Sequence, residues 1–388
     1  MICPTTSSAE IETWDVIVIG AGPAGTSAAI SSSRCGHSVL LLDAKKFPRH
    51  KICGGCLNQV SINLLNSLIG DDHPFWQTGN QLDSFSLHHR GRTFSIPMPL
   101  GLAVERSQLD QCLVDVAIQS GVTFRDSATG KLGDMEDDEG DYRMVEIKQS
   151  GRTSVTRAKS VVVAGGLNNR CVADSELLQQ SSTDDSRVGV ETVLAKNSMG
   201  ERSFLDSQRA IRMAVGRIGY GGITELSDGR LHIAASVDRS ALRQLGPLGT
   251  VNQIFSEAGV KEVPDAAGVW RGSPPLTSRA SRLGDRRVFL VGDAATYVEP
   301  FTGEGIRWAL QSGIGVTPFV QRAVEGWRDN LTEQWESWYW DNIGRSQKLC
   351  ARISWALKSP MTCFVAHQVL RFQPWLAGQV AKRLNQAI

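Results

Sequence analysis

A short apolar run followed by three spaced glycines constrains the fold more than any other feature of this chain. Val16–Ile19 is apolar and β-branched, as expected for a buried parallel strand. Gly20, Gly22 and Gly25 follow with the spacing G-x-G-x-x-G, and the small residue Ala24 lies in a predicted helix. The first glycine permits a tight turn, the second lets backbone approach a pyrophosphate, and the third allows close helix–sheet packing. The spacing predicts a dinucleotide site at the positive end of this helix.

The next segment completes the unit. Helical signals end at Gly36, and Ser38–Leu42 reads as a second strand. Asp43 closes that strand about 20 residues after the glycines, where a carboxylate would accept hydrogen bonds from ribose hydroxyls. We assign the adjacent Ala44 to the same site. A glycine triplet alone is weak evidence, but the strand, helix, second strand and carboxylate all occur here in order.

A second strand–turn–helix unit occurs nearly three hundred residues later. Arg287–Val291 predicts a strand. Asp293 follows the end of that strand, and its carboxylate could accept hydrogen bonds from the hydroxyls of a ribityl chain. Backbone N–H groups at the start of the following helix could face the N1–O2 edge of a flavin. The alternative is an ordinary turn, because Gly-Asp turns are common. Because the N-terminal unit is also present, we favour a site in which FAD lies extended across one domain. The residues of the second unit that we expect to bind FAD are Gly292, Asp293, Pro300, Gly303, Glu304, Gly305 and Ile306.

Two further segments carry family motifs. Pro48–Cys56 is similar to a P-R-x-K-x-C-G-G element, and Arg106–Asp110 is similar to an R-x-x-L-D helix start. Together with the two units above, they resemble flavoproteins of the geranylgeranyl reductase type, within the class A (para-hydroxybenzoate hydroxylase-like) flavin enzymes. The resemblance covers most of residues 12–325.

The resemblance implies a place for each motif along FAD. The three glycines and Asp43 would hold the ADP half, Arg106 would lie against the cofactor, and Asp293 would meet the ribityl and pyrophosphate region. Gly303–Gly305 would lie beside the isoalloxazine, and the loop 49–56 would lie close to the flavin ring. The basic residues Arg49 and Lys51 would favour a phosphate or a reduced flavin anion. The cofactor-binding residues predicted outside the second unit are Gly20, Gly22, Ala24, Gly25, Asp43, Ala44, Arg49, Lys51, Gly54, Arg106 and Gly165.

Three segments depart from the patterns of related enzymes. Class A monooxygenases carry an Asp-Gly element after a late strand, whereas Gly165 stands at the aspartate position here, which weakens NADPH use by the monooxygenase route. Prenyl reductases often carry Y-x-W-x-F-P, but Gly219–Ile223 lacks the tryptophan and the proline, which argues against a geranylgeranyl substrate. Flavin halogenases carry W-x-W-x-I-P. Trp338–Trp340 resembles it superficially but lies in a helical tail, so we expect packing or membrane contact and no halogenation.

The cysteines and histidines give a more limited signal. Cys53 and Cys56 form C-G-G-C, either a flavin-proximal loop in which Cys53 contacts substrate or ring, which we favour, or a redox dithiol. The other six cysteines are scattered and are expected to be incidental or buried thiols. His88 and His89 are adjacent and would point to opposite faces of a strand, and the seven histidines show no metal spacing. We therefore predict no metal site.

These elements predict a mixed α/β (α+β) fold: a Rossmann-like FAD-binding domain of the para-hydroxybenzoate hydroxylase type, an antiparallel β-rich substrate domain and a helical C-terminal tail. No second glycine-rich nucleotide motif follows a strand, so a separate NAD(P)H domain is not expected. The FAD-binding domain is expected at 1–80, 101–180 and 275–326, the substrate domain at 81–100 and 181–274, and the tail at 327–388.

Composition limits the partners. The chain has 388 residues, 41% of them hydrophobic, which suffices for at least two domains. A net charge of +1 gives no field for nucleic acid. Residues 1–10 lack the features of a secretory signal, and no run of about 18 apolar residues occurs, so the expected location is the cytoplasm. The tail is rich in tryptophan and basic residues, which suits either peripheral contact with the inner membrane face or helix packing.

We therefore predict an FAD-dependent oxidoreductase in which flavin N5 transfers hydride to or from a carbon–carbon double bond of an apolar, isoprenoid- or polyketide-like substrate. NADPH or NADH would be a transient electron donor. Cys53 and Tyr220 are the candidate catalytic proton donors. One alternative is a flavin monooxygenase that hydroxylates or epoxidises an apolar substrate. A second is a non-catalytic, FAD-stabilised membrane-docking module.

Overall fold

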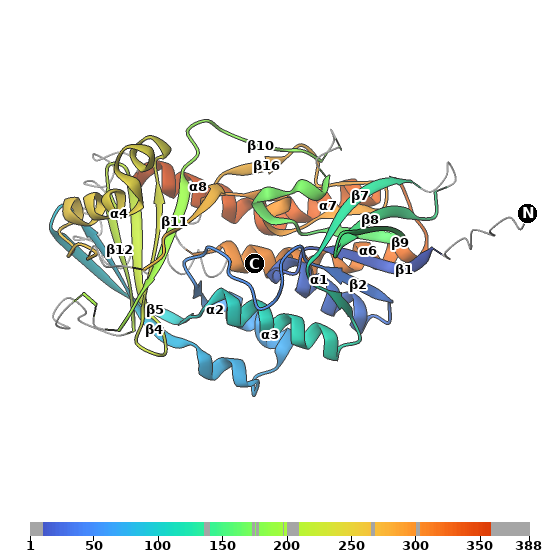
Figure 1. Ribbon diagram of the computed structural model, residues 1–388, viewed down its shortest axis with the longest axis horizontal. Helices are drawn as coiled ribbons and strands as arrows, with labels where there is room; N and C mark the ends of the chain where they lie inside the picture. The colour runs from blue at the N-terminus through green and yellow to red at the C-terminus, as the bar shows by residue number, and fades with distance from the viewer. Residues whose placement is uncertain are drawn as a thin grey trace, which may run out of the picture.

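The computed structural model describes residues 11–135, 140–172, 175, 178–196, 198–199, 209–264, 268–299 and 303–357. These residues form two large sheets near opposite ends of an elongated molecule, with several helices between them (Figure 1). None of the helices in these ranges combines the length and the apolar composition that a bilayer crossing needs.

The first sheet contains the glycine-rich strand predicted from the sequence. Its main path runs β17-β18-β9-β1-β2-β6, with β7 and β8 joined through β9. β1 pairs in parallel with β2 and β9, and Val16, Ile17 and Val18 are fully buried because α1 and α6 pack against this part of the sheet. The strands are β1 (Glu12–Ile19), β2 (Val39–Leu42), β6 (Thr123–Arg125), β7 (Ala128–Met135), β8 (Arg143–Gln149), β9 (Arg152–Val163), β17 (Gly284–Asp285) and β18 (Val288–Leu290).

The second sheet has the order β15-β11-β14-β13-β12-β4-β5-β3. Its pairs are antiparallel except β4 with β12, which are parallel because the chain passes through the first sheet before it returns. Its strands are β3 (Cys56–Leu57), β4 (Asn80–His89), β5 (Arg92–Ala103), β11 (Val188–Leu194), β12 (Ala210–Gly216), β13 (Gly219–Glu225), β14 (Leu231–Val237) and β15 (Arg271–Pro275). A small third sheet contains β10 (Gln180–Ser182), β16 (Ser278–Ala280) and β19 (Thr296–Tyr297).

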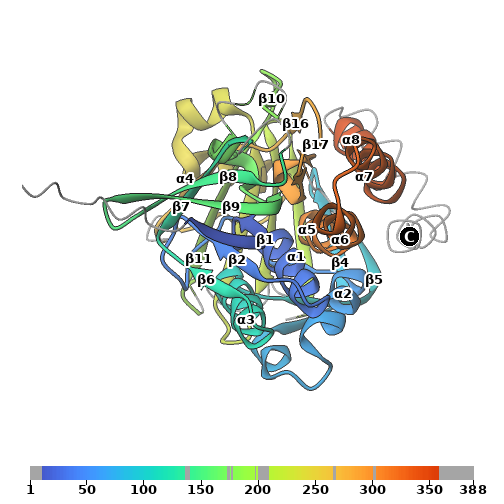
Figure 2. The ribbon, with the colours of Figure 1, turned by 90° about the vertical axis from the view of Figure 1, so that its right-hand side faces the viewer.

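The helices divide between the sheets. α4 covers the outer side of the second sheet, while α1, α5 and α6 pack together beside the first, with α7 and α8 outside them (Figures 1 and 2). A short π-helical turn, Trp340–Gly344, joins the last two. The helices are α1 (Pro23–Arg34), α2 (Gln59–Ile69), α3 (Arg106–Gln119), α4 (Arg239–Ala258), α5 (Gly305–Gly315), α6 (Thr317–Glu325), α7 (Leu331–Tyr339) and α8 (Arg345–Leu357).

The described part of the tail is a packed element of the protein. Trp335 and Tyr339 are fully buried, and Trp335 stacks on Trp338 with ring centroids 5.4 Å apart. Gly315 of α5 leaves the space that the Trp338 ring occupies. Packing therefore accounts for the Trp338–Trp340 segment, whereas Trp375 and the basic residues beyond Leu357 lie outside the described residues.

Candidate functional site

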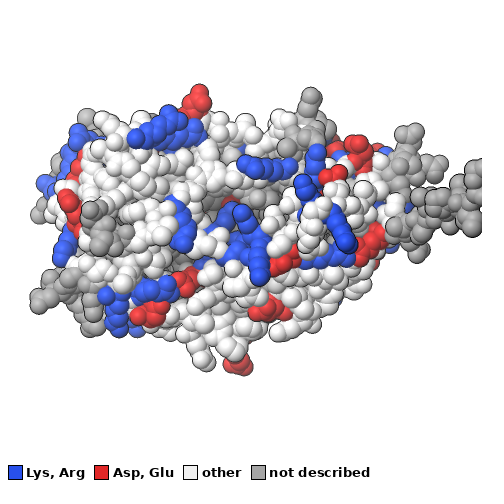
Figure 3. Space-filling model, viewed as in Figure 1, with Lys and Arg blue, Asp and Glu red and all other residues white. Residues whose placement is uncertain are grey.

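A large cavity lies between the two sheets and reaches from the start of α1 to the inner face of the second sheet. Its volume is about 1450 Å³, above the roughly 300–1,000 Å³ common for one small ligand. The cavity therefore has room for a cofactor and a substrate together. The described part of its wall carries six Lys and Arg side chains against three carboxylates. Lys and Arg side chains gather around the hollow in the middle of the face seen in Figure 3.

The glycine turn after β1 packs as its spacing predicts. Gly20 has φ +110°, and a Cβ there would lie 2.3 Å from the carbonyl oxygen of Ala164. A Cβ at Gly25 would lie 1.8 Å from the carbonyl oxygen of Gly20, so α1 sits directly on the turn. Gly22 instead borders the cavity, and no side chain caps the first turn of α1. The backbone N–H groups of that turn are thus available to an anion.

Two arginines stand in front of this turn. A Cβ at Gly22 would lie 3.5 Å from Nη2 of Arg49 and 3.9 Å from Nη2 of Arg106. Buried Asp110 fixes both, because its Oδ2 lies 3.0 Å from Nη1 of Arg49 and 2.8 Å from Nη2 of Arg106. Two guanidinium groups and a helix N-terminus around a glycine form a cradle that fits a pyrophosphate.

Asp43 orders the same region. Its Oδ2 accepts hydrogen bonds from the backbone N of Ala21 (2.9 Å) and Nε of Arg49 (3.2 Å), and Oδ1 accepts one from the backbone N of Lys45 (2.9 Å). Asp43 also lines the cavity. The ribose contact expected from the sequence stays a prediction, but the carboxylate clearly holds the turn and Arg49 in place.

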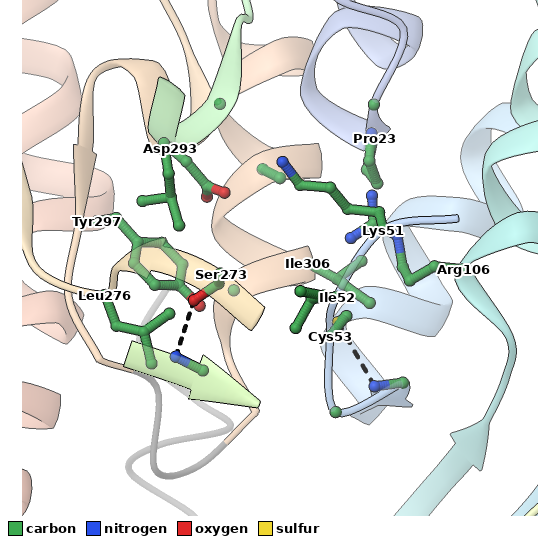
Figure 4. Close-up of a pocket in the computed structure, with 18 of the residues that line it drawn as sticks. Pro23, Lys51, Ile52, Cys53, Arg106, Ser273, Leu276, Asp293, Tyr297 and Ile306 are labelled. Atoms are coloured by element: carbon green, nitrogen blue, oxygen red, sulfur yellow. Dashed lines mark hydrogen bonds between the residues drawn. The ribbon is translucent and has the colours of Figure 1, made fainter. Parts of the chain in front are cut away.

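Lys51 and Asp293 bring opposite charges into the middle of the cavity (Figure 4). Burial lowers the pKa of Lys51, and the negative charge of Asp293 opposes that shift. Burial raises the pKa of Asp293, and the positive charges of Lys51 and Arg106 oppose this shift. Nε2 of Gln180 donates to the carbonyl oxygens of Asp293 (2.6 Å) and Ala294 (3.0 Å), which anchors the turn that bears this carboxylate.

The start of α5 forms another part of the wall. Gly303, Gly305 and Ile306 line the cavity together with the buried Glu304. Burial raises the pKa of Glu304, and Arg307, 3.0 Å away, opposes the shift. The N-terminal end of α5 thus borders the cavity, where its partial positive charge favours a negatively charged group.

The second sheet supplies an apolar wall. β4, β5 and β12 contribute it, together with α8, and its residues are Phe85, Leu87, Phe94, Met98, Ile211, Met213 and Ile353. Tyr220 and Tyr297 also line the cavity, and burial raises the pKa of both hydroxyls well above 10. Both hydroxyls therefore stay protonated at neutral pH, and the proton-donor role expected of Tyr220 stays a prediction.

The structure brings most of the predicted site residues together, while their individual roles stay predictions. Gly25 and Gly292 pack behind the wall, where a Cβ at Gly292 would lie 2.7 Å from Cβ of Ala24, and Pro300 lies outside the described residues. The predicted residues that line the cavity are Gly20, Gly22, Ala24, Asp43, Ala44, Arg49, Lys51, Cys53, Gly54, Arg106, Gly165, Tyr220, Asp293, Gly303, Glu304, Gly305 and Ile306.

The sequence interpretation missed other residues at this site. Glu191 of β11 accepts a hydrogen bond from the backbone N of Cys53 (2.9 Å), and His50 and Arg271 line the cavity beside it. Cys53 and Glu191 are 138 residues apart in the sequence, so no spacing motif could have indicated this contact.

Comparisons with known proteins agree with this geometry. The model of the FAD binding domain family matches residues 13–330. A menaquinone reductase of Mycobacterium tuberculosis (strain ATCC 25618 / H37Rv) is 28% identical over 369 residues, covering 89% of this chain and 84% of that protein. Digeranylgeranylglycerophospholipid reductase 2 of Methanopyrus kandleri is 26% identical over 326 residues, covering 80% and 78%.

Solved structures show the same fold. The myxobacterial chondrochloren halogenase CndH superposes with a TM-score of 0.75 at 20% identity, covering 96% of this chain and 91% of that one. A flavoprotein/dehydrogenase from Cytophaga hutchinsonii gives a TM-score of 0.69 at 20% identity, covering 86% and 85%. The predicted fold class and the predicted FAD cofactor are confirmed. The chain belongs to the FAD binding domain family, and it is a geranylgeranyl reductase-like FAD-dependent oxidoreductase.

Proposed function

We propose that this protein reduces a carbon–carbon double bond in an apolar, isoprenoid-like substrate. The observation that carries the proposal is the continuity of the cavity, which joins the basic glycine cradle at α1 to the apolar wall of β4, β5 and β12. The names of the relatives, a menaquinone reductase and a digeranylgeranylglycerophospholipid reductase, support a substrate of this class.

Different residues along the cavity would bind different parts of FAD and of the substrate. The α1 turn, Arg49 and Arg106 would hold the pyrophosphate of FAD, Asp293 the ribityl hydroxyls, and the start of α5 the flavin edge. When bound, FAD supplies two-electron hydride chemistry at N5. The apolar wall would orient the substrate chain and exclude water from the reacting carbons. NADPH or NADH would bind transiently and reduce the FAD.

An anaerobic single-turnover experiment tests the proposal. Protein reduced with one equivalent of dithionite is mixed with geranylgeranyl diphosphate or menaquinone-4, and the product is exposed to air before mass spectrometry. A quinol returns to the quinone in air, whereas a saturated chain keeps its two added hydrogen atoms. Reoxidation of the flavin with a saturated product supports the proposal. Oxygen-dependent incorporation of an oxygen atom into the substrate would instead favour monooxygenation and contradict it.

Peripheral membrane contact through the tail belongs to the same proposal. Basic residues are interleaved with tryptophans in its sequence, as at Arg371, Trp375, Lys382 and Arg383. An isoprenoid substrate would be drawn from a bilayer. Sedimentation with vesicles containing anionic lipid tests it. We expect the full chain to bind and the triple variant Arg371→Glu, Lys382→Glu, Arg383→Glu to lose binding, and equal binding of both would refute the contact.

A further inference from the structure

One buried carboxylate ties the 49–56 loop to the second sheet. Glu191 is only 1% exposed. Its Oε2 accepts the hydrogen bond from the backbone N of Cys53, and Nε2 of His232, on β14, lies 3.5 Å from the same oxygen. Nε2 of His50, from the loop itself, lies 2.9 Å from Oε1. A single side chain of β11 therefore contacts the loop twice and one imidazole of its own sheet.

The charge of Glu191 exceeds what a structural tie requires. A neutral amide oxygen would accept the hydrogen bond of the Cys53 N–H equally well, and burying a carboxylate costs several kcal/mol unless charged partners compensate. The described residues contain no group of three or more His, Cys, Asp or Glu side chains that could hold a metal ion. The groups around Glu191 that can compensate its charge are the imidazoles of His50 and His232 and the guanidinium of Arg271, the residue that pairs with Glu191 between β15 and β11.

His50 is placed to carry protons between solvent and the cavity. Among the described residues that line the cavity it is the only histidine, and its side chain is 43% exposed, so solvent can reload it. Burial lowers its pKa, helped by the charges of Arg271 and His232, whereas Glu191 and Glu105 raise it.

Three other groups on the wall, the hydroxyls of Tyr220 and Tyr297 and the thiol of Cys56, are weaker acids than an imidazolium. Burial raises the pKa of both Tyr220 and Tyr297 well above 10, and burial together with Cys53 raises the pKa of Cys56 to about 12. Imidazole is also the side chain whose ordinary pKa allows proton transfer in both directions near neutral pH.

We propose that His50 delivers the proton that substrate reduction consumes, and that Glu191 is the positioning residue that holds its imidazole at the cavity wall. The inference rests on the proposed reductive function. Saturating a double bond breaks one π bond and forms two C–H bonds. One hydrogen arrives as hydride with an electron pair from reduced FAD, which is thereby oxidised. The other arrives as the proton of the His50 imidazolium, which becomes neutral and is reprotonated by solvent.

Single-turnover flavin reoxidation tests the proton donor. With geranylgeranyl diphosphate or menaquinone-4 as the probe, we expect His50→Ala to slow reoxidation by about 100-fold or more, the usual contribution of a general acid. FAD content should stay at the wild-type level, added imidazole should restore part of the rate, and restoration should grow as pH falls and more imidazolium forms. His88→Asn, on β4 away from the cavity wall, is the matched control and should behave as wild type.

The failures of the inference and of the proposed function can be told apart. An active wild-type protein with an equally active His50→Ala variant, or a slowed variant that imidazole does not rescue, overturns the proton-donor assignment alone. A wild-type protein that reduces neither probe overturns the proposed function and the inference that rests on it.

Two measurements on the full chain test the positioning role without turnover. NMR titration of histidine-labelled protein should give a lower His50 pKa in Glu191→Gln than in wild type, because the carboxylate charge is gone. Alkylation of Cys53, measured by mass spectrometry against exposed Cys35, should be several-fold faster in Glu191→Ala but unchanged in Glu191→Gln, whose amide oxygen still accepts from the Cys53 N–H. An unchanged His50 pKa in Glu191→Gln would overturn the positioning role.

Discussion

Gly313 of α5 lies so close to Ala24 of α1 that a Cβ at Gly313 would stand 2.1 Å from the carbonyl oxygen of Ala24. This contact joins the helix of the N-terminal glycine motif to the helix of the second motif. The two motifs, nearly three hundred residues apart, thus meet as backbone against backbone, and the cavity opens along the ends of both helices.

The first prediction concerns this contact. Gly313→Ala should lower the free energy of unfolding by about 1–3 kcal/mol, because backbone cannot yield as a flexible side chain would and the helices must move apart. The same displacement should weaken FAD binding. Urea denaturation and FAD titration measure the two effects. Gly326→Ala is the control, since its Cβ would meet no atom within 4 Å, and a Gly313→Ala protein as stable as this control would contradict the packing argument.

Asp110 gives the second prediction. Its buried carboxylate pairs with Arg49 and Arg106. Asp110→Ala should destabilise the protein by roughly 3–5 kcal/mol, because it leaves the buried guanidinium of Arg106 without its counter-charge and Arg49 with Asp43 as its remaining partner. Asp110→Asn should be less damaging, since an amide still accepts hydrogen bonds. Urea midpoints of the FAD-free proteins measure this, and equal stability of wild type and Asp110→Ala would show that the pairs do not form.

The third prediction is that the stability of the protein depends on pH through Asp15 of β1. Burial acts to raise the pKa of Asp15, but hydrogen bonds from Lys159 and Ser38 outweigh it and lower the pKa from 3.8 to about 2. A carboxylate with a lower pKa in the folded state stabilises the protein above its unfolded pKa, so this stability is lost as pH falls from about 4 to about 2.

The size of that effect is small because the pair is partly exposed and solvent screens it. We expect a loss below about 1 kcal/mol. Unfolding midpoints measured across this pH range should fall less steeply for Asp15→Asn than for wild type. Identical slopes for the two proteins would mean that Asp15 titrates normally.

How much could be predicted from the sequence depends on whether a residue acts through its neighbours in the chain. The β1–α1 turn, Asp43 and the Gly292–Asp293 turn were predictable, because each requires a residue type at a set distance from a strand end. The packing role of Gly25 followed from the same spacing. The fold class and the cofactor depended on these local units, and both were correct.

Other features needed the folded chain. α4 was missed because Gly246 and Pro247 interrupt its helical pattern, and the structure shows a kink there with φ +67° at Gly246. β13 was not recognised as a strand because three glycines dilute its apolar alternation. Glu191 was missed for a different reason: its contact with Cys53 spans 138 residues of chain, and a lone glutamate in a strand carries no signal.

The central claim is that the two glycine-rich motifs form one FAD site, and FAD content per chain tests it most directly. Gly22→Glu would place a carboxylate in the cradle formed by α1, Arg49 and Arg106. We predict about one FAD per chain in purified wild-type protein and almost none in Gly22→Glu, with the circular dichroism of the fold retained. Wild-type stoichiometry in Gly22→Glu, or a wild-type protein that takes up no FAD, would contradict the account.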